Sequence, residues 1–330
     1  MSKRKLNKRQ QARVKGLQQS HLNKARQHQT ITADSGRHGI VTANHGKTVV
    51  IEDEAQQRFI CNIRQNIDTL VCGDHVIWQQ DTASGGIVLA MEPRSNYLAR
   101  PDNRGQAKVV AANIDQLMIV SATKPALNTR LIDRYLVAAE LAGITPVIVF
   151  NKVDLADKFK MNDLREQLVV YAELGYQVIF TSVKQEHGID SLQPVLINKI
   201  SVFVGQSGVG KSSLINTLLP ESPAEVGDIS ASTQKGRHTT TLAQLYHLPS
   251  GGDLIDSPGI REFGLWQVTI EQAAEGFIEF HPYMGQCRFR DCLHEQEPGC
   301  RVREAVEQQK ISEQRWDSYR RIIESLRQHK

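Results

Sequence analysis

The chain has 330 residues, 40% of them hydrophobic and 23% charged, so it is long enough for two or three domains with hydrophobic cores. No run of eighteen apolar residues occurs, and the N-terminus lacks the apolar core of a signal peptide. These features argue against a membrane-embedded or secreted protein and predict a soluble, cytoplasmic one. Five cysteines, three of them clustered late, fit a reduced compartment with a metal site better than a disulfide framework.

The formal net charge of +4 conceals a strongly basic N-terminus. Residues 1–33 contain nine Lys and Arg and no acidic residue; removing these nine from the total of 40 leaves 31 basic against 36 acidic residues. We therefore expect residues 1–36 to form a basic, disordered arm. Such an arm suits the phosphate backbone of a nucleic acid, and a solvated tail that only aids solubility is the alternative.

Short alternating runs separated by glycines occupy residues 37–100. Strands are expected over Gly39–Ala43, Thr48–Glu52, Gln57–Asn62, His75–Gln79 and Gly86–Met91. Five strands in so short a segment predict a small barrel of the OB type, a common platform for RNA, with Cys61 and Cys72 in its core. An SH3-like barrel without a nucleic-acid role is the alternative, because periodicity does not separate the two.

The polar segment Arg94–Lys108 is expected to be a linker, and an α/β domain is predicted over residues 106–272. Ile114–Ala122 is a nearly continuous apolar strand of the kind buried in parallel sheets. Further elements are expected in the order helix Leu131–Ala142, strand Pro146–Phe150, helix Met161–Glu173, strand Gln177–Phe180, strand Ile200–Val204 and helix Ser213–Leu219.

Two loops in the first half of this domain predict recognition of guanine. Residues 151–154 read N-K-V-D, an N-K-x-D motif at the carboxyl end of a strand, where open α/β sheets bind ligands. Asp154 can accept hydrogen bonds from N1–H and N2–H₂ of guanine, whereas adenine offers no such donor pair. Asn151 is expected to brace the loop and Lys152 to lie over the ring. Residues 181–184, T-S-V-K, resemble the S-A-K loop whose backbone amides meet guanine O6.

A phosphate-binding loop is predicted between the strand Ile200–Val204 and the helix Ser213–Leu219. Residues 205–212 read G-Q-S-G-V-G-K-S, which is G-x-x-x-x-G-K-S in the strand–loop–helix setting of a P-loop. The glycines let backbone N–H groups turn toward a phosphate, Lys211 reaches the β- and γ-phosphates, and Ser212 is placed to ligate Mg²⁺. With two guanine elements beside it, this loop is expected to bind GTP rather than ATP.

Two segments after the P-loop helix are candidates for the switches of a GTPase. Residues 236–241 read G-R-H-T-T-T, where one threonine would close on Mg²⁺ when the γ-phosphate is present. Thr240 is favoured, Thr239 is the runner-up, and a plain hydroxyl-rich strand start is the alternative. Residues 256–259 read D-S-P-G, the D-x-x-G of switch II, in which Asp256 would hold Mg²⁺ through water and the Gly259 N–H would sense the γ-phosphate.

The expected nucleotide-contacting residues are Asn151, Lys152, Val153, Asp154, Ser182, Gly205, Gln206, Ser207, Gly208, Val209, Gly210, Lys211, Ser212, Ser213, Asp256 and Gly259. The guanine loops precede the P-loop, so the usual motif order G1-G2-G3-G4-G5 becomes G4-G5-G1-G2-G3. A circular permutation of this kind is tolerated because domain termini often lie close together.

Catalysis of hydrolysis is assigned to Lys211, Thr240 and His238. Ile260 follows the D-x-x-G motif at the position where a water-orienting glutamine often sits, and an apolar side chain cannot orient water. Intrinsic hydrolysis is therefore expected to be slow unless another group substitutes. His238 is the candidate, and a surface histidine without a catalytic part is the alternative.

A metal-binding module is predicted over residues 273–330. Three cysteines and one histidine in the pattern C-x₄-C-x-H-x₅-C offer a complete tetrahedral ligand set for one structural Zn²⁺: Cys287, Cys292, His294 and Cys300. Without a fifth ligand, a catalytic zinc is not expected. Val302–Gln328 is expected to be one long helix whose apolar side packs on the module, a partner-binding face being the alternative.

This combination resembles the RsgA (YjeQ) family of bacterial GTPases that depend on the small ribosomal subunit. The resemblance is carried by the barrel, the permuted motif order, G-R-H-T-T-T, D-S-P-G-I-R-E-F at residues 256–263 and the zinc motif, and it covers about residues 37–330. It implies a role in late maturation of the 30S subunit, binding to that subunit and its 16S rRNA, and weak GTPase activity that the subunit stimulates. The nucleotide and zinc positions above, Ile260 and His238 follow the family pattern.

The resulting expectation is a monomer that binds GTP and GDP, contacts ribosomal RNA and does not bind a membrane. A passive RNA-binding scaffold with structural GTP is one rival. A GTPase of metabolism or membrane signalling is another, although the basic arm, barrel and zinc motif argue against it. An ATP-dependent kinase is a third, but no acceptor-binding motif supports it.

Overall fold

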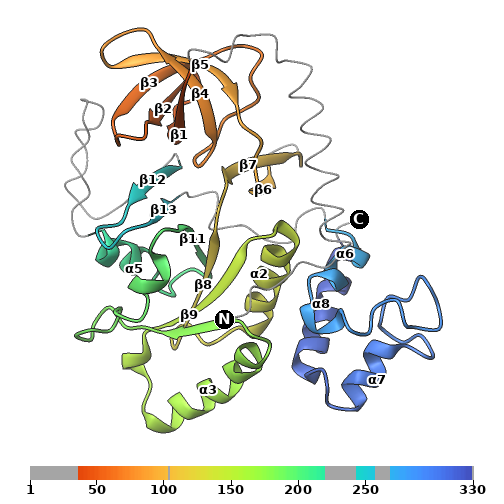
Figure 1. Ribbon diagram of the computed structural model, residues 1–330. Helices are drawn as coiled ribbons and strands as arrows, with labels where there is room; N and C mark the ends of the chain where they lie inside the picture. The colour runs from red at the N-terminus through yellow and green to blue at the C-terminus, as the bar shows by residue number, and fades with distance from the viewer. Residues whose placement is uncertain (1–35, 103–104, 220–242, 257–267, 329–330) are drawn as a thin grey trace. The chain divides into compact units, whose positions relative to one another are not determined.

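The computed structural model describes residues 36–102, 105–219, 243–256 and 268–328. The chain divides into two compact units (Figure 1). One comprises the described residues up to Tyr97 together with Ala111–Asn113, and the other comprises Leu98–Val110 and the described residues from Ile114 onward. The predicted basic arm lies outside the described residues except for Gly36. Among the helices that are described, none combines the length and the apolar character needed to cross a membrane.

The first unit is a closed five-stranded barrel. Its strands are β1 (Arg37–Asn44), β2 (Thr48–Glu52), β3 (Arg58–Ile63), β4 (His75–Gln80) and β5 (Gly85–Met91). They pair in the order β1-β2-β3-β5-β4, and β4 pairs back with β1 to close the barrel. The β3–β5 pair is parallel and the others are antiparallel. This arrangement confirms the predicted OB-type barrel rather than the SH3-like alternative.

Alternate side chains of these strands fill the barrel. The core contains Val41, Val49, Ile51, Phe59, Cys61, Leu70, Val76, Trp78 and Val88. Cys61 and Cys72 are both fully buried, as predicted. The fully buried Asp74 accepts a hydrogen bond from the Val71 N–H at 2.7 Å and pairs with Arg94 at 2.6 Å, so its charge is compensated.

The expectation of a linker over Arg94–Lys108 is wrong. This segment contains β6 (Tyr97–Pro101) and the start of β7 (Ala107–Ala112), which form a two-stranded sheet. Both strands are short, and polar residues interrupt their alternation, so a period of two was not visible in the sequence. Leu98 is nevertheless fully buried, because tertiary packing rather than local pattern defines the strand.

The second unit is built on a parallel sheet. Its strands are β8 (Gln116–Ala122), β9 (Thr145–Asn151), β10 (Gln177–Phe180), β11 (Ile200–Gly205) and β13 (Asp253–Asp256), with β12 (Gln244–His247) antiparallel to β13. The order is β10-β9-β8-β11-β13-β12, and the first five strands are parallel. The strands predicted in this region are confirmed. Because parallel strands end at one edge, the loops that carry the predicted motifs are placed together.

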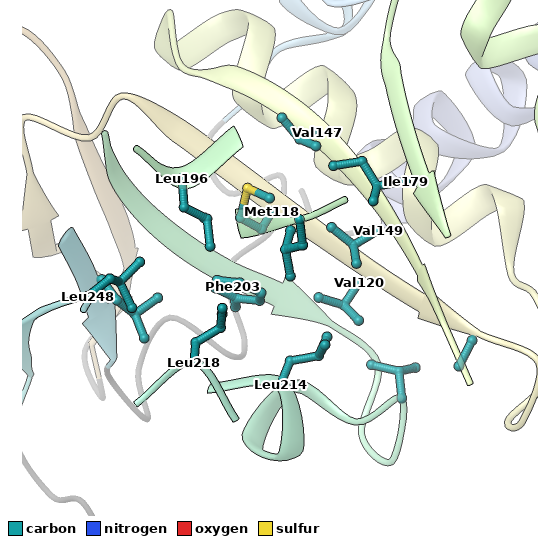
Figure 2. Close-up of a cluster of buried hydrophobic side chains, with 14 residues drawn as sticks. Met118, Val120, Val147, Val149, Ile179, Leu196, Phe203, Leu214, Leu218 and Leu248 are labelled. Atoms are coloured by element: carbon teal, nitrogen blue, oxygen red, sulfur yellow. The ribbon is translucent and has the colours of Figure 1, made fainter. Parts of the chain in front are cut away.

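The sheet has helices on both faces. The helices of this region are α2 (Thr129–Ala142), α3 (Lys158–Glu173), α4 (Gln193–Leu196) and α5 (Lys211–Leu218), with a 3₁₀ turn η2 (Val153–Leu155). Figure 2 shows Met118 and Val120 of β8 in one cluster with Leu214 and Leu218 of α5. Ile119, which alternates to the other face of β8, lines a recess with residues of α2. A parallel sheet covered by helices on both faces agrees with the predicted α/β domain.

The C-terminal region is helical, but the single long helix expected over Val302–Gln328 is wrong. The structure has α6 (Ile270–Glu275), a 3₁₀ turn η4 (Ile278–Phe280), α7 (Arg301–Glu307) and α8 (Glu313–Gln328). Between α7 and α8 the chain passes through Gln309 with φ +57°, and Ile311 is buried. The apolar period continues on both sides of this turn, which explains why the break was not visible in the sequence.

A buried arginine joins this helical region to the α/β sheet domain. Arg315 of α8 is fully buried and forms ion pairs with Asp133 of α2 at 2.5 Å and with Glu279 of η4 at 2.7 Å. Its guanidinium carbon lies 4.5 Å from the ring centroid of Phe277. Burial raises the pKa of Asp133, and the Arg315 charge opposes that shift. Through this residue α8 contacts both its own helical region and α2.

Replacing Arg315 tests this junction. Arg315→Met should lower the free energy of unfolding by about 3–5 kcal/mol, because it leaves two buried carboxylates without the cation that compensates their charge. Arg321→Met is the matched control: Arg321 pairs with Asp317 at 2.8 Å but is half exposed, so its loss should cost less than about 1 kcal/mol. Urea denaturation of both variants measures the difference, and equal stabilities would contradict the role given to Arg315.

Candidate functional site

The phosphate-binding loop predicted at residues 205–212 joins β11 directly to α5. Gly205 adopts φ +138°, and a Cβ built there would lie 2.1 Å from the Val120 carbonyl oxygen of the neighbouring strand β8. Gly210 adopts φ +100°, and a Cβ there would lie 2.4 Å from Asn151 Nδ2. Both positions therefore exclude other residues. Val209 is buried in the hydrophobic core that packs on the sheet, which anchors the loop.

The cation of this loop is held close to its backbone. Lys211 is buried, and its Nζ donates to the carbonyl oxygens of Gly205 and Gln206 at 2.7 Å each. Ser212 and Ser213 are exposed in the first turn of α5. The positive end of the helix and the Lys211 ammonium are thus directed to the same loop, which is suited to an anion.

The N-K-x-D loop is fastened to the phosphate-binding loop by side chains. Asn151 is fully buried; its Nδ2 donates to the Val209 carbonyl at 3.0 Å, and its Oδ1 accepts from Thr181 Oγ1 at 3.2 Å. Lys152, in the left-handed region at φ +59°, donates from Nζ to the carbonyl oxygens of Gly208 and Lys124. The Lys152 stem consequently crosses from one loop to the other.

The two predicted guanine loops also contact each other. Ser182 is fully buried and its Oγ donates to Asp154 Oδ1 at 2.5 Å. The same Oγ accepts from the Lys184 N–H at 3.2 Å, and the Val153 N–H donates to the Thr181 carbonyl at 3.3 Å. Asp154 is partly exposed and is oriented by Ser182. The carboxylate is therefore held in a defined direction at the edge of the sheet.

The structure brings together most of the predicted site residues. Residues 151–154, Ser182 and 205–213 all lie at the carboxyl ends of β9, β10 and β11. Asp256 ends β13, which pairs with β11 in parallel with Val202 opposite Ile255, so Asp256 lies at the same edge. The predicted switch residues Gly236–Thr241, Gly259 and Ile260, including His238, Thr239 and Thr240, fall outside the described residues.

Two contributions to this edge were not predicted from the sequence. The carbonyl of Lys124 receives the Lys152 ammonium, and the hydroxyl of Thr181, the first residue of the T-S-V-K motif, braces Asn151. Thr181 directly follows β10 and Lys124 lies two residues after β8, and that is the signal that could have identified them. A residue at the carboxyl end of any strand of such a sheet is a candidate for the ligand site.

The predicted metal ligands form a compact cluster. One ligand atom from each of Cys287, Cys292, His294 and Cys300 lies within 4.8 Å of the others. His294 Nδ1 is 3.5 Å from the Sγ atoms of both Cys287 and Cys300. In a tetrahedral site with metal–sulfur and metal–nitrogen bonds of about 2.3 and 2.1 Å, the distance between the nitrogen and a sulfur atom is about 3.6 Å. The cluster could therefore hold a metal ion.

The surrounding backbone is arranged to support these ligands. The N–H groups of Arg301 and Arg303 donate to the Sγ atoms of Cys287 and Cys300, at 3.4 and 3.5 Å. The carbonyl of His294 accepts from Trp316 Nε1 at 3.1 Å, which ties the cluster to α8. Burial lowers the pKa of His294, which favours the neutral imidazole that ligates metals.

The parallel sheet, the P-loop and the preceding guanine-type loops define a circularly permuted P-loop GTPase domain. The RsgA GTPase family model matches residues 91–266, more than half of the chain. The chain belongs to the RsgA GTPase family.

Relatives and solved structures agree with this assignment. The chain is 52% identical to "Small ribosomal subunit biogenesis GTPase RsgA" of Chromohalobacter salexigens, with 99% of each chain covered. It is 48% identical to "Small ribosomal subunit biogenesis GTPase RsgA 1" of Vibrio vulnificus, over 99% of this chain and 96% of that one. The crystal structure of YjeQ from Thermotoga maritima matches with a TM-score of 0.74 and 36% identity, over 88% of this chain and 98% of the other. The structure of "YloQ, a circularly permuted GTPase" matches with a TM-score of 0.74 and 28% identity, over 91% and 98%.

Metal content tests the cluster. The purified chain should carry one divalent metal ion, measured by inductively coupled plasma mass spectrometry, and Cys292→Ser should remove it. A strong chelator should lower the melting temperature, because the loop between the ligands is too small to form a core of its own. Cys72→Ala, in the barrel, is the matched control and should keep the metal. Full metal content in the Cys292 variant would exclude the site.

Proposed function

We propose that the chain hydrolyses GTP to GDP and phosphate and acts in maturation of the small ribosomal subunit by binding the 30S particle and its 16S rRNA, which stimulates hydrolysis. The observation that carries the proposal is the linkage of the base-recognition loop to the phosphate loop. Asn151 and Lys152 donate to Val209 and Gly208, so the two loops form one site of fixed geometry. A nucleotide whose base and phosphates match that spacing is the natural ligand.

Guanine is assigned to this site because its N1–H and N2–H₂ groups are the donors that a carboxylate can accept. Asp154, oriented by Ser182, accepts from N1–H and N2–H₂ of the base. The Ser182 and Lys184 N–H groups donate within the protein, so the Val183 N–H between them is assigned to O6. The Lys152 stem covers the ring. Adenine offers no donor pair to this carboxylate, so the two hydrogen bonds from the base would be lost, which is costly in a site of this kind.

The phosphates are assigned to the P-loop, residues 205–213. Backbone amides and Lys211 hold the β- and γ-phosphates and stabilise the charge that develops as water attacks in line. Ser212, Thr240 and Asp256 would hold Mg²⁺, which neutralises phosphate charge. The Gly259 N–H would contact the γ-phosphate and so sense whether it is present. Since Ile260 cannot orient water, we assign that task to His238, positioned when the subunit binds.

The flanking segments are proposed to contact the ribosome. The names of the relatives connect them with small-subunit biogenesis. In this proposal the basic arm, residues 1–36, and the barrel, residues 37–100, bind 16S rRNA, and residues 106–272 form the GTPase. Residues 273–330 hold one structural Zn²⁺, because three thiolates and an imidazole suit that ion. The protein acts as a monomer in the cytoplasm.

GTP hydrolysis with and without purified 30S subunits tests the proposal. Phosphate release should rise at least about tenfold with 30S subunits and not with 50S subunits, because the catalytic arrangement is completed by the correct partner. His238→Ala should remove most of the stimulation while leaving GTP affinity within about twofold of the parent.

Three outcomes would contradict parts of this account. Phosphate release that 30S subunits do not change would contradict stimulation by the subunit, and a scaffold with structural GTP would then be favoured. Full stimulation in the His238 variant would remove this histidine from the mechanism. Failure to cosediment with 30S subunits would exclude the ribosomal partner.

A further inference from the structure

Two phenylalanines differ from the rest in their exposure. The chain has nine phenylalanines, and eight lie in the described residues. Six of these eight are buried or half-buried, whereas Phe159 is 83% exposed and Phe289 is 43% exposed. Single exposed apolar residues are common on protein surfaces, so exposure alone assigns no role to them.

The sequence around the two exposed rings is what distinguishes them. Phe159 lies between Lys158 and Lys160, and Phe289 lies between Arg288 and Arg290. None of the other phenylalanines has a basic residue on both sides. All four flanking side chains are exposed, and among the described residues none forms an ion pair within 4 Å. Each ring is therefore accompanied by two exposed cationic groups that form no ion pair with the neighbouring Asp157 or Asp291.

The fold does not account for the first of these triplets. Lys158, Phe159 and Lys160 form the first turn of α3, and this first turn contains no acidic residue. Cations near a helix N-terminus oppose the helix dipole, and acidic residues are favoured there instead. The cap is already supplied by Asp157, whose side chain accepts from the Lys160 N–H at 2.9 Å. The helix dipole and the cap therefore do not explain two cations and an exposed ring at this helix start.

The second triplet lies in the loop between the metal ligands Cys287 and Cys292. The guanidinium carbon of Arg288 lies 5.4 Å from the centroid of the Phe289 ring, a cation–π contact. The Arg288 N–H donates to the Gly299 carbonyl at 3.1 Å, which fixes the start of the loop. The metal cluster thus supports an exposed ring and its adjacent cation in a defined position.

We propose that Phe159 and Phe289 are stacking platforms for unpaired bases of the 16S rRNA, with their flanking Lys and Arg residues on the adjacent phosphates. Protein interfaces are depleted in lysine, which argues against a protein partner for the Lys158–Lys160 triplet. RNA offers both required groups: splayed bases that stack on aromatic rings, and phosphates that pair with cations. This inference rests on the proposed binding of ribosomal RNA and identifies which described side chains would contact it.

Affinity for protein-free 16S rRNA, measured by filter binding with the full-length protein, tests the proposal. Phe159→Ala and Phe289→Ala should each weaken binding by about fivefold or more, and the double variant by the product of the two. Phe159→Leu and Phe289→Leu should weaken it similarly, since leucine keeps apolar surface but has no π face. Phe159→Trp should retain parental affinity.

Controls separate stacking from other effects. Val169→Ala removes an exposed apolar side chain from the same helix α3 and should leave affinity unchanged. GTP hydrolysis without subunits should be the same in all these variants. Affinity of the double alanine variant within twofold of the parent would overturn the proposal, as would parental affinity in the leucine variants, which would indicate an apolar contact. Failure of the parent to bind 16S rRNA would instead contradict the proposed function itself.

Discussion

The hydrogen bonds that join the N-K-x-D loop to the P-loop are the constraint on which the nucleotide site depends. Asn151 donates to the carbonyl of Val209, 58 residues later in the chain, and Lys152 donates to that of Gly208. In the permuted order the N-K-x-D and T-S-V-K loops come before the P-loop. No short connection holds them together, so tertiary hydrogen bonds must do so, and the bond from Asn151 is buried. A buried amide that lost its partner would carry the full cost of desolvation, which makes this geometry strict.

The C-terminal region is attached to the same domain by a second buried polar contact. Arg315 bridges Asp133 of α2 and Glu279 of η4, while Trp316 and Tyr319 of the same helix donate to the carbonyls of His294 and Leu293. One helix, α8, therefore contacts both the GTPase domain and the loop that carries the three cysteines and His294. This arrangement gives that loop a fixed attachment within the second unit.

Local sequence patterns predicted the elements that have strong local signals. The P-loop, the N-K-x-D motif and the cluster of three cysteines and one histidine are each encoded within a short segment, and the parallel sheet follows from long apolar runs. The β6–β7 hairpin and the turn near Gln309 were missed because tertiary burial of Leu98 and Ile311, not periodicity, determines them. Similarly, a fully buried Arg315 could not be predicted, since its partners lie far away in the chain.

The base preference of the Asp154→Asn variant tests the central claim most directly. Xanthine carries an oxygen where guanine carries N2–H₂, so an amide at position 154 matches xanthine, while its Oδ1 can still accept from Ser182. We expect kcat/KM for GTP to fall by about two orders of magnitude or more and that for xanthosine triphosphate to rise. An unchanged preference for GTP would contradict the assignment of this loop as the guanine-reading element.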